Sequence, residues 1–335
     1  MGWTLTSLAA KASKALGATP AWARPDGVAH AAAVAQRGVR GEGDTVFARV
    51  HARRLTAASP ADRKALEAAV SELGADAAVI ERATASGAPL TAVAALAAAW
   101  HRLPDTAKET IRHPAGSGIG SVRFGAIRAV QVDQTTCGAA VMAMMLMTGD
   151  PFVAAWVATG RSLGDHLPPE CAAALEIGAR TIEERWQSLQ RVLHREATHG
   201  ALGPLPWPRA YGTPPWRVDN ATRFAGLRFR GAIVDDTDGE RVAAAVAHAS
   251  AALRDGIPVP VYTGGDSASG LDQVVPRHVV LLTARSEAGF EVYEPSSGRV
   301  LPLAVDRVYG GGAKEPALGH WTRVCWMVLP RARKR

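Results

Sequence analysis

Apolar residues along the first third of the chain recur with the spacing of amphipathic helices. Residues 59–73 open with Ser-Pro, a capping side chain followed by proline at the first helical position, and their larger apolar residues then fall on one face. Residues 75–84 and 90–100 show the same periodicity, and the first sixteen residues have the pattern of an amphipathic helix. The pattern predicts an alanine-rich helical region over residues 1–115.

The centre of the chain holds an apolar run that begins at a cysteine. Cys137-Gly-Ala-Ala continues into Val-Met-Ala-Met-Met-Leu-Met without a proline, so we expect a buried helix with Cys137 in its first turn. Unpaired backbone N–H groups and the helix dipole favour thiolate over thiol at this end, and Gly138 leaves room for a substrate carbonyl. The competing interpretation is an inert thiol packed in the core, which is common for a lone cysteine.

The last third of the chain has short runs of branched residues separated by turn residues, as strands do. Strands are expected at 258–263, 278–284, 289–293, 299–303 and 323–329. A helix is expected before them, over residues 240–253. Helices and strands are thus segregated along the chain, which predicts an α+β fold with an antiparallel sheet.

Two titratable residues lie on neighbouring predicted strands. His278 stands at the start of one strand and Glu294 at the end of the next. Pairing of these strands would place the carboxylate beside the imidazole, where it would fix the tautomer and orientation of the ring. Gln131, six residues before Cys137, would donate its side-chain amide to an oxyanion, a contribution of about 3 kcal/mol where one such donor has been removed. Cys137, His278 and Glu294 would then act as nucleophile, base and orienting acid.

The segments Gln131-Val-Asp-x-x-x-Cys137-Gly-Ala-Ala and His278-Val-Val-Leu, with the strand that ends at Glu294, resemble the papain-like peptidases that process bacteriocins at double-glycine leaders. The resemblance implies a nucleophile helix packed on an antiparallel sheet. It also implies Cys137 as nucleophile, His278 as general base, Gln131 as oxyanion donor and residue 294 as the third member of the triad.

Three features depart from that family. The third position is Glu294, where the family usually has Asp or Asn, and Asp306 and Asp272 are the alternative partners for the histidine. The segment between Cys137 and His278 is longer than in the compact leader peptidases, so the double-glycine substrate is not carried over. No transporter is expected, because neither a transmembrane span nor an ATP-binding motif is found in the sequence.

These observations favour a cysteine-dependent hydrolase of peptide or isopeptide bonds, with a peptide or protein substrate. The same thioester chemistry would also serve acyl transfer or side-chain deamidation, because a triad does not choose the acceptor. The alternative from another class is a non-catalytic member of the fold that binds a peptide. The oligomeric state stays open.

The domain boundaries follow from composition. We expect the helical region at 1–115, a glycine-rich linker at 116–121, the papain-like domain at 122–330 and a basic tail at 331–335. The net charge of +7 is partly due to that tail, and the remaining excess is scattered, so no nucleic-acid partner is expected.

The three cysteines, Cys137, Cys171 and Cys325, are isolated in the sequence. Their spacing signals neither a disulfide framework nor a metal site, and no cofactor is expected. No run of 18 uncharged apolar residues occurs, so no membrane span is expected. The N-terminus has no secretory pattern, which predicts a cytoplasmic protein, or one exported without a recognisable N-terminal signal.

Two loops near the predicted site carry further expectations. Residues 203–216 hold two tryptophans among five prolines, a composition that excludes a regular helix or central strand and is typical of a packed loop or the lip of a cleft. Residues 264–270, rich in Gly and Ser, precede His278 and are placed to gate it.

Overall fold

The main sheet of the molecule joins strands that lie far apart in the sequence. The computed structural model describes residues 4–15, 45–199, 201, 212–221, 223–235, 237–265, 276–310 and 312–331. In this part of the chain the main sheet is antiparallel at every pairing and has the strand order β1-β8-β7-β6-β5-β9-β4. Its strands are β1 (Gly120–Ser121), β4 (Arg228–Ile233), β5 (Val259–Gly264), β6 (His278–Arg285), β7 (Gly289–Glu294), β8 (Arg299–Ala304) and β9 (Arg323–Arg331). A separate hairpin pairs β2 (Arg123–Phe124) with β3 (Ile127–Arg128).

Helices make up the rest of the regular structure. The first group is α1 (Leu5–Ala15), α3 (Val46–Ala57), α4 (Pro60–Leu73), α5 (Ala77–Ala85), α6 (Leu90–Trp100) and α7 (Asp105–Arg112). The second is α8 (Cys137–Gly149), α9 (Pro151–Thr159), α10 (Pro169–Glu176), α11 (Ile182–Thr198), α12 (Pro215–Ala221), α13 (Gly239–Arg254) and the short α14 (Val305–Val308). Single 3₁₀ turns occupy Gly74–Asp76 and Pro316–Leu318. The α+β class predicted from the sequence is therefore confirmed.

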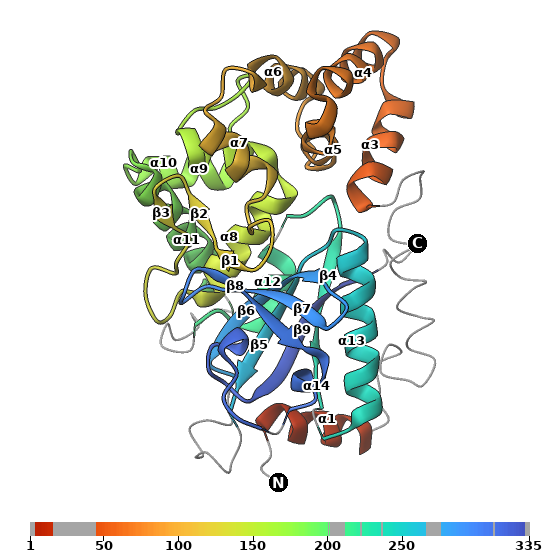
Figure 1. The fold of residues 1–335 in the computed structure, drawn as a ribbon, viewed down its shortest axis with the longest axis vertical. Coiled ribbons are helices and arrows are strands. Elements are labelled where there is room, and N and C mark those ends of the chain that lie inside the picture. Colours follow the sequence, from red (N-terminus) through yellow and green to blue (C-terminus); the bar gives the residue numbers. More distant parts are fainter. Residues whose placement is uncertain are drawn as a thin grey trace.

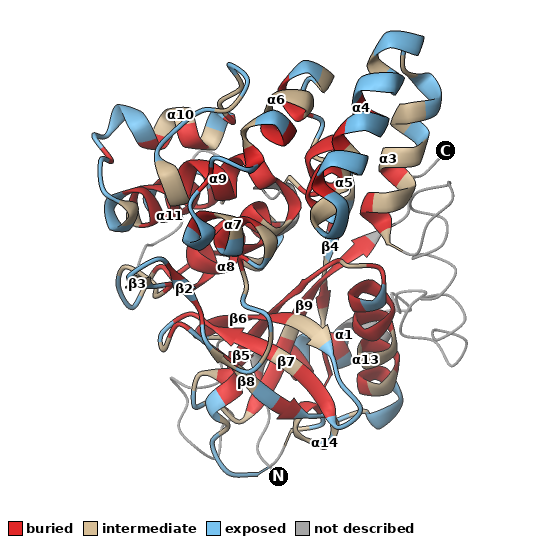
Figure 2. Ribbon diagram, turned by 45° about the horizontal axis from the view of Figure 1, so that its top comes forward, coloured by how far each residue is buried: buried red, intermediate tan, exposed pale blue. Residues whose placement is uncertain are grey.

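The helices and the sheet form two parts that meet at α8 (Figure 1). Helices α3–α7 and α9–α11 gather at one end of the molecule, while the sheet lies at the other with α13 and α1 beside it. Both α8 and α13 pack on β6. The first five positions of β6 are all buried, as the red strands in Figure 2 show, because a strand with a helix on each face has no solvent-exposed side.

One hydrophobic core runs from Val46 on α3 to Leu329 on β9. The N-terminal helices are fixed to the sheet part at the end of α13. The backbone N–H of Val46 donates to the carbonyl of Asp255 at 2.9 Å, and Arg49 forms an ion pair with the Asp255 carboxylate. The Phe47 ring packs against Phe224 with a centroid distance of 5.2 Å. Helices α3–α7 thus share their core with the rest of the protein.

Several elements predicted from the sequence are confirmed with close boundaries. The helix predicted over 59–73 is α4, whose cap residue Ser59 accepts from the backbone N–H of Asp62. The segment 90–100 is α6, and the cysteine helix starts at Cys137 itself. The predicted strands of the last third are β5 to β9.

Other elements differ from the sequence expectations. Strand β4 is not among the predicted strands, and it pairs along its whole length with β9. Pro215 and Trp216 open helix α12, although the composition of 203–216 predicts irregular structure; proline is tolerated here because the first turn of a helix has no intrahelical acceptor for its N–H. The predicted linker 116–121 ends in β1, whose two residues pair with β8.

Some expectations fall on residues outside those described. They include most of the two loops near the site, at 203–211 and 266–270, and the tail beyond Arg331. Within the described residues, no single helix has the length and apolar character of a membrane span, and α8 and α9 satisfy such a test only as a pair bent by 111°.

Candidate active site

Cys137 is the first residue of α8, so its thiol lies at the N-terminal end of a buried helix. The preceding turn is closed by hydrogen bonds between Asp133 and Thr136, and the first intrahelical bond runs from Ala140 N–H to the Thr136 carbonyl at 2.8 Å. The N–H groups before Ala140 have no acceptor within the helix and remain available to a negatively charged group. Cys137 itself is 3% exposed.

His278 and Glu294 come from neighbouring strands and are in direct contact. His278 is the first residue of β6 and Glu294 the last of β7, and these strands pair antiparallel. The imidazole Nε2 and the carboxylate Oε1 are 2.8 Å apart. Because Nε2 is taken by Glu294, Nδ1 is the ring nitrogen available to another partner.

The Glu294 carboxylate is held by the backbone of the turn that follows it. Ser296 N–H donates to Oε1 at 2.8 Å and Ser297 N–H donates to Oε2 at 2.7 Å. Burial alone would raise the pKa of this carboxyl group, but the hydrogen bond and charge of His278, with the hydrogen bonds from the Ser296 backbone and from Ser297, outweigh it and lower the pKa to about 2. Glu294 is therefore ionised at every pH near neutrality.

The imidazole connects Glu294 to the thiol. Burial lowers the pKa of His278, while hydrogen bonds with the Cys137 thiol and with Glu294 raise it, and together they bring it to about 9. The structure thus brings together three of the four residues singled out in the sequence, in the order Cys137, His278, Glu294. A thiol beside an imidazole that is itself held by a carboxylate is the arrangement of a cysteine nucleophile, its base and an orienting acid.

Gln131, the fourth residue, lies next to the Glu294 turn. Its backbone N–H donates to the Pro295 carbonyl at 2.8 Å, and its side-chain oxygen accepts from the Ser296 hydroxyl at 3.1 Å. Its side-chain amide donates to the Asp133 carbonyl at 2.7 Å. Within the described residues the amide makes no hydrogen bond to the thiol or the imidazole. The structure places Gln131 in the loop that leads to Cys137, but engages its amide locally.

Glu294, and not Asp306, is the carboxylate bonded to the histidine. Asp306 lies exposed on α14, and Asp272 is outside the described residues. The other two cysteines, Cys171 on α10 and Cys325 on β9, are fully buried and form no disulfide.

Two further residues, Gly319 and Thr213, pack against His278 and the start of α8, and the sequence did not predict either contact. Gly319, with φ +68°, lies against the His278 ring so closely that a Cβ there would be 2.2 Å from Cδ2. Thr213 lies against Gly138, where a Cβ would meet its hydroxyl at 2.6 Å. A glycine before a histidine is a weak turn signal, and a threonine among prolines is none, so neither contact could be read from the sequence.

The thiol and the imidazole are covered in this structure. His278 is only 8% exposed, and Thr213 is held over the first turn of α8 because the Tyr262 hydroxyl donates to its carbonyl at 2.8 Å. The Thr213 hydroxyl is buried and has no hydrogen-bond partner in the described part of the chain. A substrate therefore has to displace or replace part of this cover to reach Cys137.

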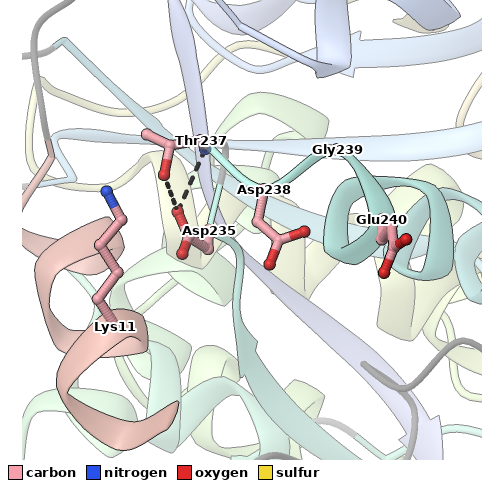
Figure 3. A pocket seen from close by; sticks show the side chains of 6 residues that line it. All are labelled: Lys11, Asp235, Thr237, Asp238, Gly239 and Glu240. Atoms are coloured by element: carbon pink, nitrogen blue, oxygen red, sulfur yellow. Dashed lines mark hydrogen bonds between the residues drawn. The ribbon is translucent and has the colours of Figure 1, made fainter. Parts of the chain in front are cut away.

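A separate hollow lies between α1 and the start of α13 (Figure 3). Asp235, Asp238 and Glu240 line it, and Lys11 extends toward it from α1. Asp235 accepts from Thr237 N–H and hydroxyl at 3.2 and 2.6 Å, and Asp238 caps α13. These contacts give Asp235 and Asp238 structural roles at the turn and the helix start, and none of the four predicted site residues lines the hollow.

Comparison with known proteins gave no relative. No protein-family model, no curated protein and no solved structure matches the chain.

Proposed function

We propose that the chain is a cysteine-dependent hydrolase of peptide or isopeptide bonds, with a papain-like fold and mechanism. The observation that carries the proposal is the 2.8 Å hydrogen bond between the buried His278 imidazole and the Glu294 carboxylate, with the Cys137 thiol beside the ring at the first residue of a buried helix. A purely structural cysteine does not require a buried imidazole and a buried carboxylate aligned behind it.

In the proposed mechanism Cys137 is the nucleophile, and His278 accepts and returns a proton in each half of the reaction. His278 accepts the thiol proton and Cys137 attacks the substrate carbonyl, which forms a tetrahedral oxyanion. The intermediate collapses to a thioester as His278 gives its proton to the leaving amine. Water then attacks the thioester with His278 as base, and the acid product and the free thiol are released.

The oxyanion requires donors at the start of α8. The Cys137 N–H is one of the helix N–H groups without an intrahelical acceptor. The amide of Gln131 has two N–H bonds, of which one serves the Asp133 carbonyl, so the second is left for the oxyanion. Substrate entry would have to orient it.

Glutamate suits the third position because of the turn that follows it. Glu294 is one methylene longer than Asp, and the N–H groups of Ser296 and Ser297 each donate to one of its carboxylate oxygens. The carboxylate is thereby fixed as firmly as a shorter side chain would be, and its charge keeps the Nδ1 side of His278 directed away from Glu294.

The test is the pH dependence of alkylation of each cysteine by iodoacetamide, followed by peptide mass mapping, in the wild type and in His278→Ala. We expect fast labelling of Cys137 near neutral pH, slowed at least tenfold by His278→Ala. Labelling of Cys137 at the rate of an ordinary thiol, unchanged by the substitution, would refute the hydrolase and leave a non-catalytic peptide-binding member of the fold.

A further inference from the structure

Two arginines face each other on the β2–β3 hairpin. Arg123 and Arg128 are directly opposite in the antiparallel register, and both are exposed. The other pair of the hairpin turns inward, since Phe124 is fully buried with its ring 5.1 Å from that of Trp186. Like charges directly opposite on a strand pair destabilise it, so this arrangement calls for a reason beyond folding.

The hairpin is attached to the turn that holds the Glu294 carboxylate. Val122 N–H donates to the Gly298 carbonyl at 2.9 Å, and the aliphatic stem of Arg128 lies where a Cβ on Gly298 would be 2.8 Å from its Cγ. The next residue, Arg299, is also exposed and stands opposite Glu294 in the β7–β8 pairing. Arg123, Arg128 and Arg299, here called the arginine surface, are thus gathered beside one wall of the proposed site.

The arginine surface has no acidic partner in the described residues. None of its members takes part in an ion pair there. Glu294 is already committed to His278 and the backbone, and the Asp133 carboxylate in the nearby loop accepts from the N–H and hydroxyl of Thr135 at 2.8 and 2.7 Å. Arg123 also donates to the Ala126 carbonyl of the same hairpin, which is a neutral partner, so the positive charge of the surface is not neutralised and is open to a ligand.

We propose that the arginine surface binds an acidic side chain of the peptide substrate, close to the bond that Cys137 attacks. The inference rests on the proposed function, because the location of the surface beside the Glu294 turn is what links it to a substrate. Guanidinium groups bind carboxylates through paired hydrogen bonds, and a positive surface at the entrance of a site raises the rate of encounter with an anion. The substrate class is accordingly a peptide or protein segment with Asp or Glu near the scissile bond.

The experiment uses a set of hexapeptide vinyl sulfones that alkylate an active-site thiol. Each position carries Asp in one member and Asn in the matched member, and the rate of Cys137 labelling is measured by mass spectrometry. We expect Asp to raise the rate about tenfold at one or two positions at low salt. This preference should fall as salt rises, because the contact is exposed.

Charge reversal locates the effect. Arg123→Glu/Arg128→Glu should abolish or invert the preference for Asp, and Arg299→Glu should weaken it. The matched control is Arg228→Glu/Arg230→Glu, which makes the same change in net charge at exposed positions of β4, on the opposite edge of the sheet. The control should keep the preference.

The outcomes separate this inference from the proposed function. If Cys137 reacts with no probe and no faster than an ordinary thiol with iodoacetamide, the hydrolase itself fails. If Cys137 reacts rapidly but without preference for Asp, or if the β4 control loses the preference as much as the hairpin variant, the hydrolase stands and the arginine surface is refuted. Equal melting temperatures of the variants establish that folded proteins are compared.

Discussion

Cys137 and Cys171 are both buried thiols in the first turn of a helix, but a basic side chain lies beside the first and acidic side chains lie beside the second. Cys137 starts α8 and meets the imidazole of His278, which is held by Glu294. Cys171 is the third residue of α10, and burial together with the carboxylates of Asp150 and Glu170 raises the pKa of its thiol. A position in the first turn of a helix therefore does not keep the pKa of Cys171 low, because burial, and then the two carboxylates, outweigh it.

Glu294 and Asp150, the carboxylates near the two cysteines, have pKa values shifted in opposite directions. Glu294 receives two backbone N–H groups and the imidazole, and its pKa is lowered. Asp150 caps α9 and pairs with Arg223 at 2.9 Å, yet burial dominates and raises its pKa. Within the described residues Asp150 accepts two hydrogen bonds, from Phe152 N–H and Arg223, and Glu294 accepts three, while burial of Asp150 and the nearby Glu170 carboxylate keep its pKa raised.

The largest expected effect separates the two cysteines. Cys137→Ala should abolish hydrolysis and vinyl sulfone labelling while the protein stays folded, because the thiol is the nucleophile that attacks the substrate carbonyl in the proposed mechanism. Cys171→Ala and Cys325→Ala should leave activity largely unchanged. Activity assays and thermal unfolding on the three variants check this, and an equal loss of activity in all three would mean that structure, not catalysis, had been altered.

The next largest effect is expected from the contact between Gly319 and the His278 ring. Gly319→Ala would place a methyl group 2.2 Å from His278 Cδ2 and push the ring away from Glu294. Activity should fall about 100-fold, as a displacement of about 1 Å at a reacting group does. The rate of Cys137 alkylation at neutral pH should fall with it.

A glycine with a similar backbone angle provides the matched control. Gly178 has φ +84°, and no atom lies within 4 Å of the place that an added methyl group would take, so Gly178→Ala carries the backbone strain without a contact. Both substitutions should lower the melting temperature, and only Gly319→Ala should lower activity. A comparable activity in the two variants would remove Gly319 as a positioning residue.

The smallest effect is a change in how stability depends on pH. The pKa of His278 is raised from 6.5 to about 9, so its contribution to stability is complete below pH 6.5 and is lost as the pH rises through 9. The pKa of Glu294 is lowered from 4.5 to about 2, so its contribution is complete above pH 4.5 and is lost as the pH falls through 2. Glu294→Gln should therefore cost the most between pH 4.5 and 6.5, on the order of 3 kcal/mol in the free energy of unfolding.

Urea unfolding of the wild type and Glu294→Gln over this pH range measures the difference. Asp150→Asn is the matched control from the other region, because the raised pKa of Asp150 favours stability at low pH, the opposite sign. A stability difference between the wild type and Glu294→Gln that does not vary with pH would contradict the ionic role of this pair.

Much of the site could be predicted because its parts are local in sequence. The helix that begins at Cys137 follows from an unbroken apolar run, and the contact of His278 with Glu294 follows from the pairing of two adjacent strands. The role of the Gln131 side chain is different, because its amide chooses among several carbonyl oxygens within reach, and only the folded loop shows that it takes that of Asp133.

The parts that escaped prediction depend on neighbours far along the chain. Strand β4 has arginines at alternate positions, the pattern of an edge strand with a polar face, and becomes a strand through its pairing with β9 about a hundred residues later. Gly319 and Thr213 matter for what they touch, His278 and Gly138, and the residue types alone do not disclose these contacts. Sequence patterns thus predict elements better than they predict what covers a site.

The position of α8 between the helices and the sheet has a mechanical consequence. The Cys137 thiol belongs to a helix packed on β6, α9 and α11, whereas the proposed base His278 and acid Glu294 belong to the sheet itself. A displacement of α8 relative to β6 would separate the thiol from the imidazole while leaving every helix and strand intact. Any force, partner or bound ligand that displaces α8 from the sheet would therefore slow the proposed reaction. The shared core from α3 to β9 is what holds α8 in place.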